Sequence, residues 1–247
     1  MLIAEGISKS YKSGRRKILD SLEISIDEGE FIAVMGESGS GKSTLLAVLA
    51  GIHDPDEGQV LFEGKDLYKL SDEELSDIHK RRIGYVPQSN FFLKNYTILE
   101  NIVEPFLAGS SEERLAYEEK AKLHLEKLGI GDLADRFPHE LSGGELKRAA
   151  IARALAIRPS ILLCDEATSA LDVTVQQEIL SLLQTLRRQQ GEEFSILFIC
   201  HDIALVQQFC DRVLVMYQGR IVEEGIPDNV IQNPSHSYTK RLIDSIL

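Results

Sequence analysis

The chain is 247 residues long, which is enough to bury a sizeable core in one large domain or two lobes. Its 39 acidic and 27 basic residues give a formal net charge of -12, which disfavours nonspecific binding to nucleic acid. No apolar run approaches the roughly 20 residues that cross a bilayer, and the start of the chain does not resemble a signal peptide, so we expect a cytoplasmic protein.

The first thirty residues have the pattern of short strands and turns. Leu2–Ile7 is one candidate strand, and Ile18–Ile26 is a second, with alternating apolar positions. Between them, Tyr11 lies in a polar segment. An aromatic side chain at such a position either stacks on an adenine ring or is simply exposed, and spacing alone does not decide between the two.

A glycine-rich segment follows the apolar run Phe31–Met35 and precedes the apolar run Leu45–Ala50. It matches the phosphate-binding loop G-x-x-x-x-G-K-[ST], placed between a strand and a helix. Its glycines let several backbone N–H groups point at phosphate oxygens, Lys42 would reach the β- and γ-phosphates, and Ser43 would ligate Mg²⁺. The alternative is a glycine-rich turn before a core helix. The predicted nucleotide-binding residues are Tyr11, Gly36, Glu37, Ser38, Gly39, Ser40, Gly41, Lys42, Ser43 and Thr44.

The middle of the chain changes from strand-like to helical patterning. Gln59–Lys65 begins a predicted hairpin, and Arg82–Gln88 is a predicted strand. After it, helical spacing dominates to about residue 157, which predicts a helical insert between two halves of an α/β core. Three stretches show this spacing: Leu99–Phe106, Glu112–Leu128 and Gly144–Ile157.

Two later strands end in polar residues. The buried run Ile161–Cys164 is followed by Asp165 and Glu166, at the strand end where ligands lie in open α/β sheets. Beside a phosphate loop, Asp165 can hold Mg²⁺ and Glu166 can polarise an attacking water. A further apolar strand precedes His201, for which we predict a γ-phosphate contact, although a single histidine is usually structural or exposed.

The remaining segments are predicted as helices and one hairpin. Val175–Arg188 is amphipathic, and Gln218-Gly219 supplies the turn of a hairpin. From Ile226 we predict a short helix, a turn rich in Pro, Asn and Ser, and a final helix over Tyr238–Leu247.

The segment Leu141-Ser142-Gly143-Gly144-Glu145 ends 20 residues before Asp165 (165 − 145 = 20). Together with the phosphate loop, it resembles the nucleotide-binding subunit of ABC transporters, and the resemblance covers essentially the whole chain. In that family two subunits pack head to tail, and each ATP lies between the phosphate loop of one subunit and the signature of the other. The predicted signature residues are therefore Leu141, Ser142, Gly143, Gly144 and Glu145, where Glu145 replaces the usual glutamine and is expected to weaken nucleotide binding slightly.

The resemblance also implies roles for other residues. Tyr11 would stack on adenine, and Gln88 would sense Mg²⁺ and the attacking water while linking to the membrane subunit. Asp165 would be the magnesium carboxylate, Glu166 the general base and His201 the switch histidine. The predicted catalytic residues are thus Glu166, His201 and Gln88, and the predicted magnesium ligands are Ser43, Gln88 and Asp165. The loop that communicates between the two sites is predicted at Ser169, Ala170, Leu171 and Asp172.

The fold implied by the resemblance is the α/β P-loop NTPase fold of ABC ATPases. It has a RecA-like core, an N-terminal antiparallel β subdomain and an α-helical subdomain. We expect one nucleotide-binding domain over residues 1–247. Its parts are the core and β subdomain at 1–88 and 159–225, the helical signature subdomain at 89–158, and a C-terminal helical tail at 226–247.

Two further segments, Ala167–Gln176 and Asn233–Thr239, resemble the dipeptide/oligopeptide/nickel importer ATPases, with Ser237 in place of a proline. Peptide-importing members often carry a longer C-terminal extension with several cysteines. The chain ends at Leu247 without one, which favours nickel or metal chelates as the cargo, with small peptides almost equally expected.

The predicted function is an ATP-binding, ATP-hydrolysing subunit that powers an importer, with ATP and Mg²⁺ as its ligands. The partners implied are a second ATPase subunit, identical or paralogous, two transmembrane permease subunits and an extracellular substrate-binding protein, but no nucleic acid. Its location would be the cytoplasmic face of the inner membrane, as a peripheral protein. We expect the permease contact at Gln88 and at Asn90–Leu93, where a core-packed phenylalanine pair is the alternative.

Three other functions are considered. A non-transport ATPase of the same fold, in DNA repair or translation, usually has long coiled coils or two cassettes in one chain, and neither appears here. An exporter subunit is disfavoured by the tail resemblance. A phosphate-loop kinase would not need Leu141–Glu145. Binding to permease-containing membranes, rather than to ribosomes or DNA, would separate the importer from the non-transport ATPase.

Overall fold

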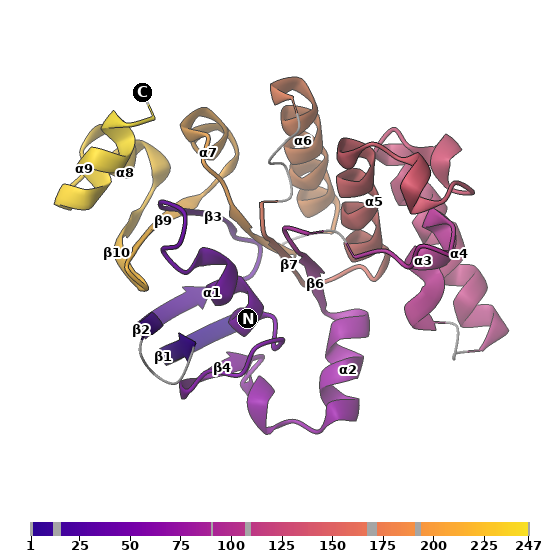
Figure 1. Ribbon diagram of the computed structural model, residues 1–247, viewed down its shortest axis with the longest axis horizontal. Helices are drawn as coiled ribbons and strands as arrows, with labels where there is room; N and C mark the ends of the chain where they lie inside the picture. Colours follow the sequence, from indigo (N-terminus) through magenta and orange to yellow (C-terminus); the bar gives the residue numbers. More distant parts are fainter. Residues whose placement is uncertain are drawn as a thin grey trace.

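The computed structural model describes residues 2–11, 16–89, 91–106, 110–166, 172–190 and 194–246. The described strands form an antiparallel sheet of order β2-β1-β4-β5 and a six-stranded sheet of order β10-β9-β3-β8-β7-β6 (Figure 1). In the larger sheet only the β10–β9 pair is antiparallel. The first sheet comprises β1 (Leu2–Tyr11), β2 (Arg16–Ile26), β4 (Glu57–Phe62) and β5 (Lys65–Asp66). The second comprises β3 (Phe31–Met35), β6 (Ile83–Val86), β7 (Ile161–Cys164), β8 (Ser195–Ile199), β9 (Arg212–Tyr217) and β10 (Arg220–Gly225).

Strand β3 is buried on both faces and separates two apolar cores. Successive side chains of a strand point to opposite faces, so Ile32 and Val34 belong to one core while Phe31, Ala33 and Met35 belong to the other. The first core also contains the antiparallel sheet and helix α1 (Lys42–Leu49), which follows β3. The continuous apolar run of β3 is typical of a strand covered on both sides, and the expected α/β architecture is confirmed.

Helices cover the other face of the large sheet and extend beyond it (Figure 1). These helices include α3 (Ile98–Val103), α4 (Ser111–Lys127), α5 (Gly143–Ala156), α6 (Val173–Gln190) and α7 (Ile203–Phe209). The short 3₁₀ helices are η1 (Leu67–Lys69), η2 (Glu104–Phe106), η3 (Gly131–Leu133) and η4 (Pro138–Glu140). Helices α3, α4 and α5 each begin with a capping box, in which a Ser or Thr hydroxyl and a Glu three residues later satisfy the first backbone N–H groups.

Two α-helices, α2 and α7, were not predicted from the sequence pattern. Helix α2 (Asp72–Arg81) is largely charged and has no buried residue, so it shows little apolar periodicity. The available signal was its capping box, formed by Ser71 and Glu74. No helix in the described part of the chain is both long and apolar enough to cross a membrane.

The C-terminal tail contains α8 (Pro227–Gln232) and α9 (Ser237–Asp244), which lie beside β10 (Figure 1). A single carboxylate on β10 holds the turn between these helices. Glu223 accepts hydrogen bonds from the Ser235 N–H at 2.7 Å, the Ser235 hydroxyl at 2.8 Å and the His236 N–H at 3.0 Å. Partial burial acts to raise the pKa of Glu223, but hydrogen bonds from the tail outweigh it and lower the pKa to about 2.

Because the Glu223 carboxylate holds the tail by hydrogen bonds, we expect the attachment of the tail to depend on pH. Because the folded-state pKa lies below the ordinary 4.5, the Glu223 carboxylate stabilises the folded state above about pH 4.5, and this contribution is lost as the pH falls toward 2. Glu223→Gln should therefore speed amide exchange at residues 235 and 236 and flatten the pH dependence of thermal unfolding between pH 6 and pH 3. The matched control is Glu224→Gln, on the exposed neighbouring carboxylate. If thermal unfolding of the wild type and of Glu223→Gln depended on pH in the same way, the prediction would be contradicted.

Candidate nucleotide-binding site

The loop between β3 and α1 has a backbone path that only glycine allows at two positions. Gly36 has a φ of +149° and Gly41 a φ of +106°. A Cβ atom on Gly36 would lie 2.3 Å from the Met216 carbonyl oxygen, and one on Gly41 would lie 2.7 Å from the Ile18 carbonyl oxygen. Because both neighbours are backbone atoms, neither position accepts a side chain without a backbone shift. The loop therefore turns tightly under the first turn of α1.

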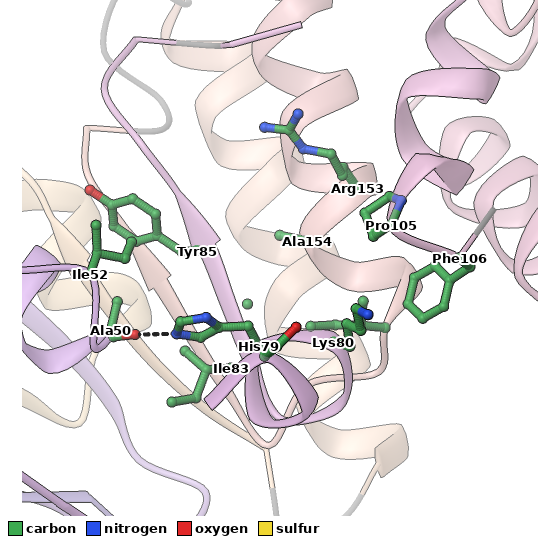
Figure 2. Close-up of a pocket in the computed structure, with 13 residues that line it drawn as sticks. Ala50, Ile52, His79, Lys80, Ile83, Tyr85, Pro105, Phe106, Arg153 and Ala154 are labelled. Carbon is green, nitrogen blue, oxygen red and sulfur yellow. Dashed lines mark hydrogen bonds between the residues drawn. The ribbon is translucent and has the colours of Figure 1, made fainter. Parts of the chain in front are cut away.

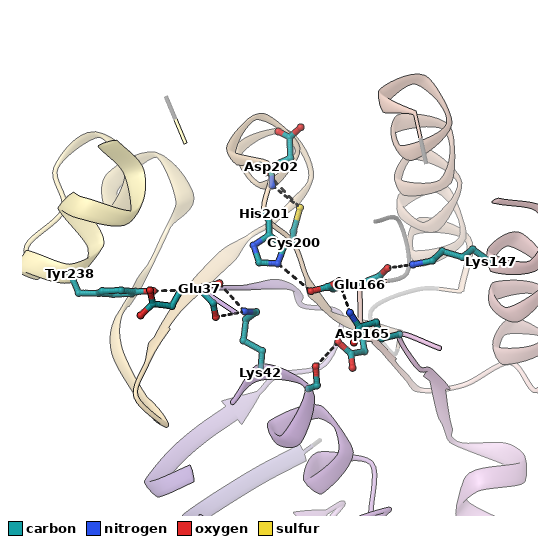
Figure 3. A network of polar contacts seen from close by, with 12 residues as sticks. Glu37, Lys42, Lys147, Asp165, Glu166, Cys200, His201, Asp202 and Tyr238 are labelled. Atoms are coloured by element: carbon teal, nitrogen blue, oxygen red, sulfur yellow. Dashed lines mark hydrogen bonds and ion pairs between the residues drawn. The ribbon is translucent and has the colours of Figure 1, made fainter. Parts of the chain in front are cut away.

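Lys42 is folded back onto this loop. Its Nζ donates to the carbonyl oxygens of Gly36 at 2.7 Å and Glu37 at 2.8 Å, and the residue is 6% exposed (Figure 3). Burial lowers the pKa of Lys42, while the charges of Glu166 and Asp165 act to raise it. The loop carbonyl groups thus hold the Lys42 ammonium group in a position from which this group can bind an anion.

Asp165, directly after β7, lies next to the loop. It is 3% exposed, and the Ser43 hydroxyl donates to its Oδ1 at 3.0 Å. Burial raises the pKa of Asp165, although the hydrogen bond from Ser43 acts in the opposite direction. A hydroxyl and a carboxylate are hard oxygen ligands that fit Mg²⁺. The described residues contain no group of three or more His, Cys, Asp or Glu able to hold a metal.

Glu166 is the centre of a second polar cluster. Its backbone lies in the left-handed region, with φ of +50°. Gln88 Nε2 donates to its Oε2 at 3.0 Å, and His201 Nε2 lies 3.3 Å from its Oε1 (Figure 3). These three side chains follow β6, β7 and β8, whose parallel register brings their carboxyl ends to one sheet edge. Lys147 on α5 donates to the Glu166 carbonyl oxygen at 2.6 Å, a contact that the sequence did not predict.

A cavity of about 280 Å³ lies between the phosphate loop, the side chains of Gln88 and Glu166, and the end of β1. Tyr11, which is 42% exposed, lies on its wall, as do Lys42, Ser43, Gln88 and Glu166. The structure therefore brings the predicted aromatic residue, the phosphate loop and two predicted catalytic residues, Gln88 and Glu166, around one space. The third, His201, lines a neighbouring cavity that Glu166 also borders. Gly36 and Glu37 lie at the start of the loop and are not part of this wall.

The predicted signature lies apart from this cavity. Ser142 is the N-cap of α5, and its hydroxyl and backbone N–H both donate to the Glu145 carboxylate at 2.7 Å. The hydrogen bonds lower the pKa of Glu145. Within the described part of the chain, no hydrogen bond joins the signature to the phosphate loop. Asp172 accepts from the Val175 N–H at 3.0 Å, whereas Ser169, Ala170, Leu171 and Asn90 lie outside the described residues.

The comparisons with known proteins identify the family. The model of the family described as "ABC transporter" matches residues 19–169, a span that contains the phosphate loop, the signature and Asp165. The chain belongs to the ABC transporter family. As expected from the sequence, it is an ABC ATPase, an enzyme that couples ATP hydrolysis to transport.

Relatives of this ABC ATPase cover nearly its whole length. It is 39% identical to the methionine import ATP-binding protein MetN of Haemophilus influenzae, over 99% of this chain and 70% of the relative. It is 37% identical to a putative peptide import ATP-binding protein of Brucella ovis, over 100% of this chain and 78% of the relative. The dimeric structure of MJ0796, a bacterial ABC transporter cassette, matches with a TM-score of 0.83 and 34% identity, over 92% of this chain and 99% of that one. The expected ABC-ATPase fold is therefore confirmed.

Proposed function

We propose that this ABC ATPase powers an importer, with Glu166 as the general base of ATP hydrolysis. The observation that carries the proposal is the convergence of Lys42, Asp165, Glu166, Gln88 and His201 at one edge of the central sheet. The names of the relatives, which are import ATP-binding proteins, support the direction of transport.

The binding step uses the phosphate loop and the end of β1. Lys42 would exchange its contacts with two loop carbonyls for contacts with phosphate oxygens, and the N-terminus of α1 would add backbone N–H donors. Tyr11 would stack on the adenine ring from the wall of the cavity. Ser43 and Asp165 would hold Mg²⁺, which neutralises charge on the phosphates when it is bound.

The hydrolytic step uses the second cluster. The Glu166 carboxylate would accept a proton from the attacking water. Gln88 and His201, which lie on opposite oxygens of this carboxylate, would orient it and the water. Lys147 holds the backbone of Glu166 and so limits the movement of the base.

The site would be completed by a second copy of this chain. The signature residues Leu141–Glu145 begin α5 in the helical subdomain, for which we propose the range 89–158, and they lie away from their own phosphate loop. A head-to-tail dimer would place the exposed Ser142 and Gly143 opposite the partner's ATP. Asp172, at the start of α6, would belong to the segment that links the two sites. The dimeric structure of MJ0796 supports this arrangement.

Glu145 is expected to weaken this dimer. Its carboxylate accepts both donors of Ser142, and its negative charge would face the γ-phosphate of the partner's ATP. Like charges in a partly exposed site cost roughly 1 kcal/mol, so Glu145→Gln should tighten ATP-dependent dimerisation about fivefold, and more at low salt. The measurement is the dimer dissociation constant by sedimentation in a Glu166→Gln background.

The matched control for this prediction is Glu140→Gln. Glu140 holds the Phe137 N–H at 2.7 Å in a similar local contact but lies outside the signature. Dimerisation that is unchanged or weaker in Glu145→Gln would contradict the role assigned to this charge.

We propose that the permease docks at a groove beside η2. A cavity of about 350 Å³ lies between α2, β6, η2 and α5, and its wall is mainly apolar (Figure 2). Arg153 on this wall donates to the Phe91 carbonyl oxygen at 2.8 Å, and its guanidinium lies 4.8 Å from the ring centre of Phe92. Phe92 packs on the core, whereas Phe91 is 76% exposed. Of the two alternatives for this aromatic pair, core packing therefore describes Phe92, and we propose the permease contact for Phe91.

The substrate proposed is a methionine-like amino acid or a small peptide. This proposal follows the names of the relatives and replaces the preference for nickel chelates, which those names do not support. An extracellular substrate-binding protein and two permease subunits would complete the importer. This subunit would then lie at the cytoplasmic face of the membrane.

The docking proposal predicts a selective defect in Phe91→Ala. Losing an exposed aromatic contact is expected to weaken assembly with the permease by about 1–2 kcal/mol, or roughly five- to thirtyfold. ATP hydrolysis by the isolated subunit should be retained, while transport in vesicles containing the permease should fall. The control is Leu115→Ala, which removes an exposed apolar side chain from α4. Unchanged transport by Phe91→Ala, or binding to ribosomes or DNA in place of membranes, would contradict the proposal.

A further inference from the structure

The C-terminal tail contacts the phosphate loop through one hydroxyl group. Tyr238, in the first turn of α9, accepts a hydrogen bond from the Glu37 backbone N–H at 2.9 Å (Figure 3). Tyr238 is 5% exposed although it lies 201 residues from Glu37 in the chain. Burial raises the pKa of Tyr238, so the phenol stays neutral at physiological pH. The contact is therefore a neutral hydrogen bond between two distant parts of the chain.

The Tyr238 ring is held in place independently of this hydroxyl. It stacks on the ring of Tyr217, with centroids 4.1 Å apart and planes inclined by 26°. Tyr217 ends β9, the strand next to β3, and the turn after it donates from the Gly219 N–H to the Ser40 carbonyl oxygen at 3.0 Å. The ring is thus placed against the same edge of the sheet from which the phosphate loop starts.

The tail that carries Tyr238 is also anchored. The hydrogen bonds to Glu223 from Ser235 and His236 hold the turn immediately before α9 on β10. The backbone that carries Tyr238 is therefore fixed by the hydrogen bonds to Glu223, and the Tyr238 ring is fixed by stacking on Tyr217. Its hydroxyl has a defined position relative to the loop.

The contact reaches the part of the phosphate loop that holds Lys42. The Glu37 peptide is held at its N–H by Tyr238, and the Glu37 carbonyl oxygen accepts from Lys42 Nζ at 2.8 Å. Tyr238 is not on the wall of the cavity that contains Tyr11 and Lys42. Any effect on nucleotide binding would therefore pass through the loop backbone.

We propose that Tyr238 is a positioning residue for ATP, and that the tail acts as a brace for the phosphate loop. This inference rests on the proposed nucleotide-binding function. With the hydroxyl removed, the Glu37 N–H loses its partner in the folded protein, and the start of the loop gains freedom that nucleotide binding must then remove. The consequence is weaker binding of ATP and ADP with no change in any group that touches them.

The test is Tyr238→Phe, which keeps the ring and its stacking on Tyr217 and removes only the hydroxyl. In the nucleotide-free protein, hydrogen exchange measured by mass spectrometry should be faster at the Glu37 amide. The dissociation constants for Mg·ATP and Mg·ADP, measured by calorimetry, should rise about three- to tenfold, as expected for one lost hydrogen bond. KM for ATP should rise by a similar factor while kcat stays at the wild-type value.

The matched control is Tyr217→Phe. The Tyr217 hydroxyl accepts only from Gln218 Nε2, at 3.1 Å, among its hydrogen bonds in the described residues, so this variant should keep wild-type exchange and affinity. Wild-type affinity in Tyr238→Phe would overturn the inference, as would an equal loss of affinity in Tyr217→Phe or unchanged exchange at Glu37. Failure of the wild-type protein to bind ATP would instead overturn the proposed function on which the inference rests.

Discussion

Glu166→Gln is expected to lower the turnover number for ATP by about 10²- to 10⁴-fold, the range typical of a lost general base. Glutamine has the same shape as glutamate, so the packing around residue 166 is retained. Its amide can still accept from Gln88, which lies 3.0 Å from the present carboxylate, but it cannot take a proton from water. Nucleotide affinity should stay near the wild-type value because Glu166 is not part of the phosphate loop. The measurement is steady-state ATP hydrolysis together with equilibrium ATP binding.

The control for this prediction is Glu178→Gln, on an exposed position of α6. It changes the same functional group at a position outside the polar cluster and should leave hydrolysis unchanged. A Glu166→Gln enzyme that retains more than about a tenth of wild-type turnover would show that proton removal by Glu166 is not needed.

Lys42→Ala is expected to weaken ATP binding by about 2–4 kcal/mol, which is roughly a 30- to 700-fold increase in the dissociation constant. The variant removes a buried cation whose Nζ now lies 2.7 Å from the Gly36 carbonyl oxygen and that would otherwise bind phosphate oxygens. Two loop carbonyls also lose their charged donor, so the loop itself should become less ordered. Calorimetry or a fluorescent nucleotide provides the measurement.

Lys69→Ala is the matched control, because the Lys69 side chain is 76% exposed on η1 and its ion pair among the described residues is a local one, with Asp66. Its ATP affinity should equal that of the wild type. If Lys42→Ala bound ATP with wild-type affinity, the segment Gly36–Thr44 would not be the phosphate-binding site.

The sequence predicted the parts of the fold that depend on local pattern. Strands β3, β7 and β8 are buried apolar runs, and helices α4, α5 and α6 begin and end within two residues of the predicted bounds. Both kinds of signal come from residues that are neighbours in the chain, so they can be read without the structure. The phosphate loop was predicted for the same reason, because its residue types and spacing are contiguous.

The arrangement of the site could be predicted only in part. The rule that parallel strands present their carboxyl ends at one edge placed Glu166 and His201 together in advance, whereas Gln88 was assigned to the site from the family resemblance. The contacts of Lys147 with Glu166 and of Tyr238 with Glu37 could not be found in this way, because they join α5 and α9 to strand ends through packing that no local pattern encodes. Helix α2 was missed because a charged surface helix lacks the apolar stripe on which prediction depends.

The most direct test of the central claim is the solution mass of Glu166→Gln with and without Mg·ATP. The claim is that two copies of this chain form a head-to-tail dimer that closes on ATP and hydrolyses it. Blocked hydrolysis should trap that dimer, so we predict that the mass doubles from 27.6 kDa when Mg·ATP is added and returns to this value when ATP is removed. A protein that binds ATP and yet stays at 27.6 kDa would contradict the claim. It would show that the signature completing the site comes from a different chain.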